Sequence, residues 1–269
     1  MVKLDKNFKF KKQFGQNFIF DKNFLISLVE LFNLNPNSNI LEIGAGAGTL
    51  TEVLANNFKK VVSVEIDKTL KEALLTLSNN YSNLSFIFDD VLNIETTNID
   101  MLFNNEKYFL VANLPYYITS QIIFKFLLQS KNISGMFVMV QKEVGERFCA
   151  IPSTKDYGVP TVLINTFGQA KIVKNVNRKM FNPVPNVDSC VINIDIVRDK
   201  FKIKDILLYQ KFIMACFQMK RKTLYNNLVK LGINKENVLK AYGQFKIDSN
   251  VRPENLTAEQ YVNLFNFLY

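Results

Sequence analysis

Asn39-Ile40-Leu41-Glu42-Ile43-Gly44-Ala45-Gly46-Ala47-Gly48-Thr49-Leu50-Thr51 is the stretch that decides the fold. Its first five residues predict a buried strand, and residues 49–55 predict a helix. The three glycines between them allow a tight turn and let the backbone approach a ligand at the start of the helix. The Gly-x-Gly-x-Gly spacing is shorter than the dinucleotide-binding pattern, so the loop alone does not identify the ligand.

Acidic residues follow the next two predicted strands. Residues 61–65 end in Glu65, about twenty positions beyond the first glycine, where nucleotide-binding α/β folds carry a ribose-binding carboxylate. Residues 84–88 are followed by Asp89 and Asp90, and Asp67 is expected to cap a helix that begins near residue 68. The glycine loop, Glu65 and Asp90 together predict one ligand-binding edge of a sheet. Taken alone, Glu65 could also be a solvated carboxylate at the end of a strand.

The stretch Val111-Ala112-Asn113-Leu114-Pro115-Tyr116-Tyr117 follows a fourth predicted strand, residues 108–112, and precedes a predicted helix, residues 119–128. Asn113 to Tyr116 therefore lie where open α/β sheets bind ligands. The Asn113 side-chain carbonyl and a backbone carbonyl can accept hydrogen bonds from an amine, while Tyr116 can stack on a planar ring. The alternative is a plain strand-to-helix turn, because Asn and Pro are common turn residues.

The other elements follow from periodicity and turn residues. We predict a helix over 21–34 capped by Asp21, a strand over 135–140, an antiparallel pair over 171–176 and 189–194, and helices from 141 and over 157–166, 235–245 and 257–268. A Pro-containing loop, 181–188, joins the antiparallel pair and can present a side chain to a site. From about residue 197 the chain becomes helical and basic, so we expect an α/β domain over 1–197 and a small all-helical domain over 198–269.

The charge of the chain favours a polyanionic partner. Lys and Arg number 33 against 24 Asp and Glu, a net charge of +9, and Lys220, Arg221 and Lys222 are consecutive. Residues 1–20 interleave basic and aromatic side chains, which could contact RNA, lie over a ligand or tether the chain to the sheet. No stretch predicts a membrane span or a signal peptide, so we expect a cytoplasmic protein without a membrane partner.

The chain contains no His, and its three cysteines, Cys149, Cys190 and Cys216, are widely separated. These cysteines are typical of reduced thiols rather than of metal ligands or disulfides, so no metal site is expected. The absence of His excludes His-dependent triads and His-ligated zinc. A reaction that needs no imidazole proton shuttle fits this composition better.

Taken together, these motifs resemble the ribosomal RNA adenine dimethyltransferase family over nearly the whole chain. The resemblance rests on residues 12–18, 41–51, 64–67, Asp90, Asn113-Leu114-Pro115-Tyr116 and 181–189, in family order. Residues 220–224 and Leu114 are more similar to the branch that acts on small-subunit RNA than to the resistance branch that acts on large-subunit RNA. Gln13, where the family is usually basic, and Tyr117, where the bacterial branch often has Asn, depart from the pattern.

The resemblance implies a Rossmann-like class I methyltransferase: a mostly parallel seven-stranded sheet with one antiparallel strand, plus a C-terminal helical domain. It implies S-adenosylmethionine as cofactor and dimethylation of two adjacent adenosines near the 3′ end of small-subunit (16S) rRNA. The roles that it implies are cofactor binding by Asn17, Ile19, Gly44, Gly46, Glu65, Asp90 and Asn113; catalysis by Asn113, Leu114, Tyr116 and Phe181; and RNA binding by Lys220, Arg221 and Lys222. The expected partner is small-subunit rRNA or a pre-ribosomal particle, and the expected state is a monomer with a role in ribosome biogenesis.

Other readings remain open at this point. Methylation of another planar amine, in large-subunit rRNA, DNA or a protein glutamine, uses similar chemistry, although Leu114 differs from the Pro usual in the DNA and glutamine enzymes. A non-catalytic RNA-binding assembly factor on the same fold is the alternative from a different class. The joint presence of Gly44, Glu65, Asp90, Asn113 and Tyr116 argues against a loss of activity.

Overall fold

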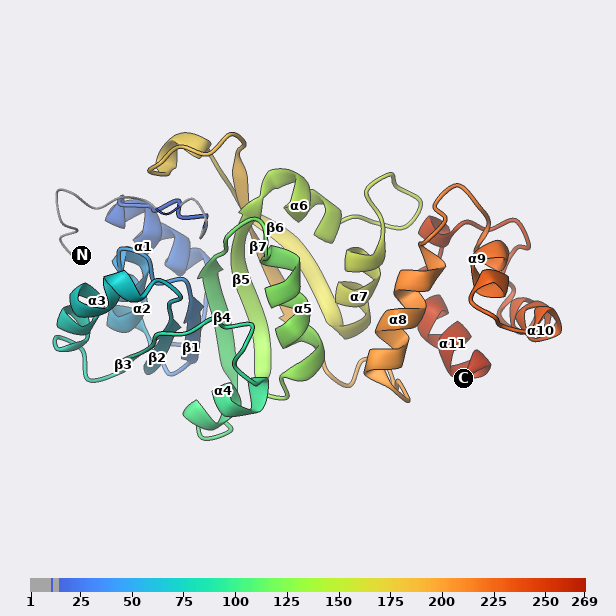
Figure 1. The fold of residues 1–269 in the computed structure, drawn as a ribbon, viewed down its shortest axis with the longest axis horizontal. Coiled ribbons are helices and arrows are strands. Elements are labelled where there is room, and N and C mark those ends of the chain that lie inside the picture. The colour runs from blue at the N-terminus through green and yellow to red at the C-terminus, as the bar shows by residue number, and fades with distance from the viewer. Residues whose placement is uncertain (1–10, 12–14) are drawn as a thin grey trace. The chain divides into compact units, whose positions relative to one another are not determined.

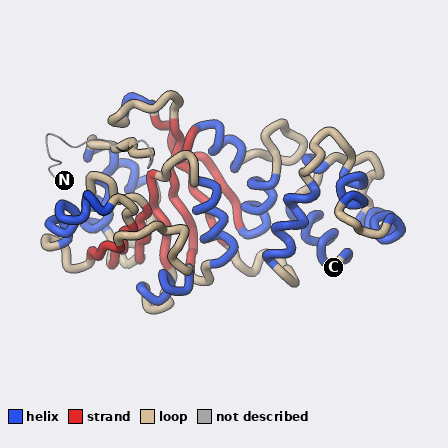
Figure 2. Tube along the Cα trace, viewed as in Figure 1, coloured by secondary structure: helices blue, strands red, loops and turns tan. Residues whose placement is uncertain are grey.

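The computed structural model describes residue 11 and residues 15–269, and within them the strands form one sheet in the order β3-β2-β1-β4-β5-β7-β6 (Figures 1 and 2). The strands are β1 (Asn39–Ile43), β2 (Lys60–Val64), β3 (Leu84–Ile87), β4 (Tyr108–Asn113), β5 (Ile133–Gln141), β6 (Gly168–Val176) and β7 (Ser189–Ile196). β3 to β5 pair in parallel, and β7 pairs with β5 in the antiparallel sense. The expected seven-stranded, mostly parallel sheet is therefore confirmed.

The register of the parallel strands brings their carboxyl ends to one edge. Ile43 of β1 lies opposite Val64 of β2 and Ala112 of β4, and Val64 lies opposite Ile87 of β3. The residues that follow these partners, Gly44, Glu65 and Asn113, consequently leave the sheet side by side. Parallel pairing thus assembles the polar residues that the sequence singles out.

Helices connect the parallel strands, as parallel pairing requires, and further helices precede β1 and follow β7. They are α1 (Lys22–Leu31), α2 (Thr49–Asn57), α3 (Lys71–Ser78), α4 (Thr96–Leu102), α5 (Thr119–Gln129), α6 (Lys142–Phe148), α7 (Val159–Phe167), α8 (Ile206–Cys216), α9 (Leu224–Lys230), α10 (Lys235–Phe245) and α11 (Ala258–Leu268), with short 3₁₀ turns η2 (Lys68–Leu70), η3 (Arg178–Met180) and η4 (Pro253–Asn255). Both predicted caps are confirmed: Asp21 accepts from the Phe24 amide at 3.0 Å, and Asp67 accepts from the Thr69 amide at 3.1 Å.

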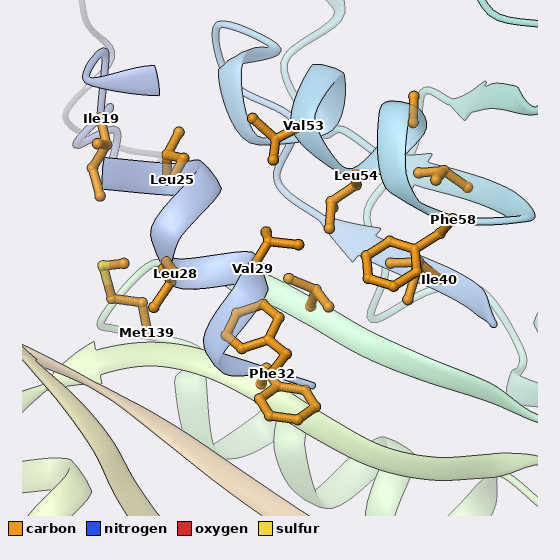
Figure 3. Packing of buried hydrophobic residues seen from close by; sticks show 14 of the residues in the cluster. Ile19, Leu25, Leu28, Val29, Phe32, Ile40, Val53, Leu54, Phe58 and Met139 are labelled. Atoms are coloured by element: carbon orange, nitrogen blue, oxygen red, sulfur yellow. The ribbon is translucent and has the colours of Figure 1, made fainter. Parts of the chain in front are cut away.

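An apolar cluster holds α1 and α2 against one face of the sheet. Leu25, Leu28, Val29 and Phe32 pack with Val53 and Leu54 of α2 and with Ile40, Phe137 and Met139 of the strands. Figure 3 shows these side chains of α1 directed toward α2 and the strands. The Phe32 and Phe137 rings are stacked, with centroids 4.3 Å apart. This packing fixes the helix that directly follows the N-terminal segment, and so positions that segment at the carboxyl edge.

Two compact units make up the chain. The first comprises the described residues up to Gly145 together with Lys171–Asp195, and the second comprises Glu146–Ala170 and Ile196–Tyr269. The second unit therefore takes in α7, which the sequence assigns to the first domain; α7 contacts α8 and α11. The division at residue 197 into separately folding domains stays a prediction. In the described part of the chain, no helix is long and apolar enough to cross a membrane.

Glu42 is a fully buried acid in the middle of the sheet. Its Oε2 accepts hydrogen bonds from Thr51 Oγ1 and Ser63 Oγ, both at 2.6 Å, while Oε1 has no partner within the described residues. Burial raises the pKa of this carboxyl to about 7, against the opposing effect of the two hydroxyl donors. The charged form is therefore costly in the native state.

We predict that Glu42 lowers stability as pH rises. Because its native pKa of about 7 lies above the ordinary glutamate value of 4.5, the native state keeps a proton that the unfolded chain loses between these values. The free energy of unfolding should fall through this window, and Glu42→Gln should remove about 2 to 3 kcal/mol of the fall between pH 5 and pH 8. Urea unfolding of both proteins at the two pH values measures this. Parallel pH profiles would contradict it.

Candidate active site

Two adjoining cavities lie at the carboxyl edge of the sheet. The first, about 70 Å³, is lined by Gly15–Phe18, Gly44, Gly46, Glu65, Ile66 and Asn113–Tyr116. The second, about 40 Å³, is lined by Ile43, Gly44, Val64, Ile66, Asp89–Val91, Pro115, Tyr117, Ile118 and Ile122. Both cavities share Gly44, Ile66 and Pro115, so they form one cleft, here called the edge cleft. The structure brings together most of the residues that the sequence predicts for a site.

The N-terminal segment Gly15–Phe18 forms one side of the edge cleft. Phe18 pairs with Asn182 through two backbone hydrogen bonds of 2.9 and 2.8 Å. Gln16 Nε2 donates to Asp67 Oδ2 at 2.8 Å, and Lys11 Nζ donates to Asp67 Oδ1 at 2.6 Å. The segment is thus anchored at both ends. Residues 1–10 and 12–14, including the basic and aromatic residues and Gln13 of the sequence analysis, lie outside the described residues.

The glycine loop needs its glycines for two different reasons. Gly44 (φ +82°) and Gly46 (φ +53°) both adopt left-handed conformations. A Cβ on Gly46 would lie 2.8 Å from the Phe18 ring, a steric overlap. A Cβ on Gly44 would meet only the Asn113 carbonyl oxygen, at 3.8 Å, and would otherwise occupy open space. Gly44 therefore leaves a cradle in the edge cleft that a bound molecule can fill.

Glu65 is 4% exposed and is held by backbone amides. Gly46 N donates to Oε2 at 2.8 Å, and Asp67 N donates to Oε1 at 2.7 Å. Burial raises the pKa of this carboxyl, and the two amide donors oppose the rise. Each oxygen keeps a further acceptor position, so the group is oriented for a ligand with two hydroxyls.

Asp90 lines the second cavity, as its position after β3 predicts. Its Oδ1 accepts from the Leu92 amide at 2.9 Å, which orients the carboxylate in its turn. Tyr117, Ile66 and Val91 line the same cavity. A flat apolar ligand that carries a hydrogen-bond donor fits a cavity of this composition.

Asn113 stands at the end of β4, where the N-terminal segment meets the sheet. Its Nδ2 donates to the Asn17 backbone carbonyl at 2.8 Å, so the side-chain oxygen remains as the acceptor. The Asn17 side chain donates to the Gly15 carbonyl at 3.1 Å, so Asn17 contributes its backbone to the site. Leu114 is 2% exposed, and its amide donates to the Met139 carbonyl at 3.3 Å.

Tyr116 lines the first cavity with its hydroxyl tied to β7. The Tyr116 hydroxyl and Ser189 Oγ lie 2.9 Å apart, and burial raises the Tyr116 pKa, partly offset by this hydrogen bond. Phe181 and Ile19 lie elsewhere: 3% and 6% exposed, they belong to the apolar cluster, and neither lines the edge cleft. Ile19 lines an apolar cavity of about 50 Å³ that also touches Gly44 and Asn113.

Lys220, Arg221 and Lys222 lie in the second compact unit, between α8 and α9, and are exposed. Lys11, Gln16 and Asp67 anchor the N-terminal segment, a role that no pattern in the sequence predicts. The only local signal is the acid two positions after Glu65, which the sequence explains as a helix cap. None of the three cysteines forms a disulfide, and the described residues contain no cluster of acids and cysteines suited to a metal.

Known proteins share this sequence and fold. The family model described as "Ribosomal RNA adenine dimethylase" matches residues 7–269. A protein of Caldanaerobacter subterraneus subsp. tengcongensis named ribosomal RNA small subunit methyltransferase A is 42% identical, over 97% of this chain and 98% of the relative. A protein of the same name from Mycoplasma mycoides is 38% identical, over 97% and 98% of the two chains.

Solved structures agree with these relatives. A dimethyladenosine transferase from Plasmodium falciparum is 25% identical with a TM-score of 0.78, over 91% of this chain and 95% of that one. The 23S rRNA methyltransferase ErmE is also 25% identical, with a TM-score of 0.70, over 94% and 99%. The expected Rossmann-like methyltransferase fold and the resemblance are therefore confirmed, and the chain belongs to the ribosomal RNA adenine dimethylase family.

Proposed function

We propose that this methyltransferase uses S-adenosylmethionine to dimethylate the exocyclic amines of two adjacent adenosines near the 3′ end of small-subunit rRNA. The observation that carries the proposal is Asn113, whose acceptor oxygen is oriented by the hydrogen bond to Asn17 beside the Gly44 cradle. The names of the relatives support the small subunit as the substrate. An rRNA or pre-ribosomal substrate, action as a monomer and the cytoplasm as location belong to the same proposal.

The edge cleft fits the cofactor part by part. The Gly44 cradle and the Gly46 amide region suit the methionine part, Glu65 suits the two ribose hydroxyls, and Asp90 suits the amine of the purine. Asn17 would border the methionine part with its backbone, and Ile19 would support it from the apolar cavity. When bound, the cofactor supplies an activated methyl group on a sulfonium.

The residues of β4 and its loop would hold the target adenine. Two acceptors, Asn113 Oδ1 and the Leu114 carbonyl, would take the hydrogens of the amine and direct its lone pair toward the methyl group. Tyr116, fixed by Ser189, would stack on the ring. Phe181 would stack on the other face after leaving the apolar cluster. The proton can leave to water, so the mechanism needs no imidazole.

Large-subunit rRNA is the second candidate substrate. The likeness to a 23S rRNA methyltransferase over 94% of this chain favours it. A non-catalytic assembly factor is the third reading, and the preorganised acceptor at Asn113 argues against it. Mass spectrometry of both rRNAs, from cells with and without the gene, separates the three.

Asn113→Ala should reduce methyl transfer by about 10²–10³, because one preorganised polar contact to the amine is lost. Single-turnover transfer to small-subunit rRNA measures the rate, and thermal unfolding checks that the variant is folded. In deleted cells, dimethyladenosine in small-subunit rRNA should return with the wild-type gene and not with the variant. Near-normal transfer by folded Asn113→Ala would refute the mechanism.

Glu65→Ala should weaken binding of S-adenosylhomocysteine by about 1–3 kcal/mol, since the ribose hydroxyls lose a buried acceptor. Calorimetry measures the affinity. Asp67→Ala keeps the amide that donates to Glu65 and should weaken binding less, because the Asp67 side chain is bonded to Lys11, Gln16 and Thr69 rather than left open to a ligand. Unchanged affinity in a folded Glu65 variant would remove Glu65 from the site.

Replacing Lys220, Arg221 and Lys222 by Ala should weaken rRNA binding and lower the slope of log affinity against log salt by about 2 to 3, as loss of up to three phosphate contacts requires. Affinity for S-adenosylhomocysteine should not change. The exposed lysines Lys230, Lys235 and Lys240 provide a control of equal charge. An unchanged slope, or an equal loss in the control, would mean that the three residues are a solvated surface.

A further inference from the structure

Tyr117 is an aromatic side chain at the edge cleft that none of the proposed roles uses. It is 59% exposed, although it lies two residues after Pro115 in the loop that forms the site. It lines the second cavity together with Asp90, Val91 and Ile66. An exposed ring at the rim of a ligand cavity is available for contact with whatever the cavity binds.

The N-terminal segment supports the ring from the other side. A Cβ built on Gly15 would lie 3.5 and 3.6 Å from the Tyr117 Cε1 and Cδ1 atoms and 3.3 Å from Pro115 Cβ. Gly15 itself is left-handed, with φ +59°. Gly15 therefore lies beside the ring, where a Cβ would make ordinary van der Waals contact with it and a tighter contact with Pro115; the left-handed backbone is what favours glycine here.

Asp90 lines the same cavity as the ring. The Tyr117 pKa is raised, first by burial and then by the negative charge of Asp90. The ring and the acid that would accept from the purine amine therefore face one cavity.

We infer that Tyr117 is a further cofactor-binding residue, whose ring covers the purine part of the bound cofactor and encloses it between the N-terminal segment and the sheet. The inference rests on the proposed function, because it takes the second cavity as the purine site. Aromatic rings bind bases by stacking, with little dependence on the polar groups of the ring. The hydroxyl of Tyr117 should then matter less than the ring.

The experiment compares S-adenosylhomocysteine with adenosine as calorimetric probes. Tyr117→Asn should weaken binding of both by the same factor, about 5- to 50-fold, since the lost contact is to the part that they share. Tyr117→Phe should remain within about twofold of the wild type. Met101→Asn exchanges another exposed apolar side chain, one that lines neither cavity, and should have no effect.

Each other result would overturn the inference in a recognisable way. Loss of S-adenosylhomocysteine binding with unchanged adenosine binding would mean that the ring acts only through the N-terminal segment. Unchanged binding of both probes with weakened rRNA binding would assign Tyr117 to the RNA surface. If Tyr117→Asn binds both probes normally while Glu65→Ala binds S-adenosylhomocysteine more weakly, the role of Tyr117 is rejected and the proposed cofactor cleft stands. If neither variant weakens binding, the proposed cofactor cleft is itself wrong.

Discussion

One hydrogen bond joins the end of the central strand to the N-terminal segment: Asn113 Nδ2 donates to the Asn17 carbonyl at 2.8 Å. If the Asn113 side-chain amide were flipped, its oxygen would face the Asn17 carbonyl oxygen. This hydrogen bond therefore leaves the Asn113 side-chain oxygen free to accept. The segment in turn pairs with Asn182 through Phe18. The N-terminal segment thus links two parts of the chain that are far apart in sequence, and the direction of the Asn113 acceptor depends on the docking of this segment.

The register of the sheet is the second constraint. β1 lies between β2 and β4, and its last residue, Ile43, is opposite the last residue of β2. Gly44, Glu65 and Asn113 follow at one edge because parallel strands end together. The three loops contribute different groups. Gly44 leaves open space where a side chain would lie, Glu65 provides a carboxylate oriented by backbone amides, and Asn113 provides a side-chain oxygen that can accept a hydrogen bond. Under the proposed function, these fixed groups would hold the ligand without a moving base.

Local patterns predict those parts of the structure that depend on near neighbours. The caps at Asp21 and Asp67 bind amides two or three residues away, and both are confirmed. The Lys11–Asp67 bond joins residues 56 positions apart, and no periodicity indicates it. The resemblance implies a role at the site for Phe181, whereas in the structure its side chain is buried in the apolar cluster. α7 shows the same limit: the sequence predicts a helix over 157–166 but not its partners, α8 and α11.

Glu65 and Asp67 follow the same strand, yet their environments shift their pKa values in opposite directions. Burial raises the pKa of Glu65 despite two amide donors. Burial also opposes ionisation of Asp67, but donors from Lys11, Thr69 and Gln16 together lower its pKa. Asp67 is occupied by the chain itself, whereas Glu65 keeps acceptor positions for a ligand. The Asp67 amide also donates to Glu65, so the residue whose side chain anchors the N-terminal segment also orients the neighbouring acid. Under the proposed function, docking of the segment and ligand binding at Glu65 would share this residue.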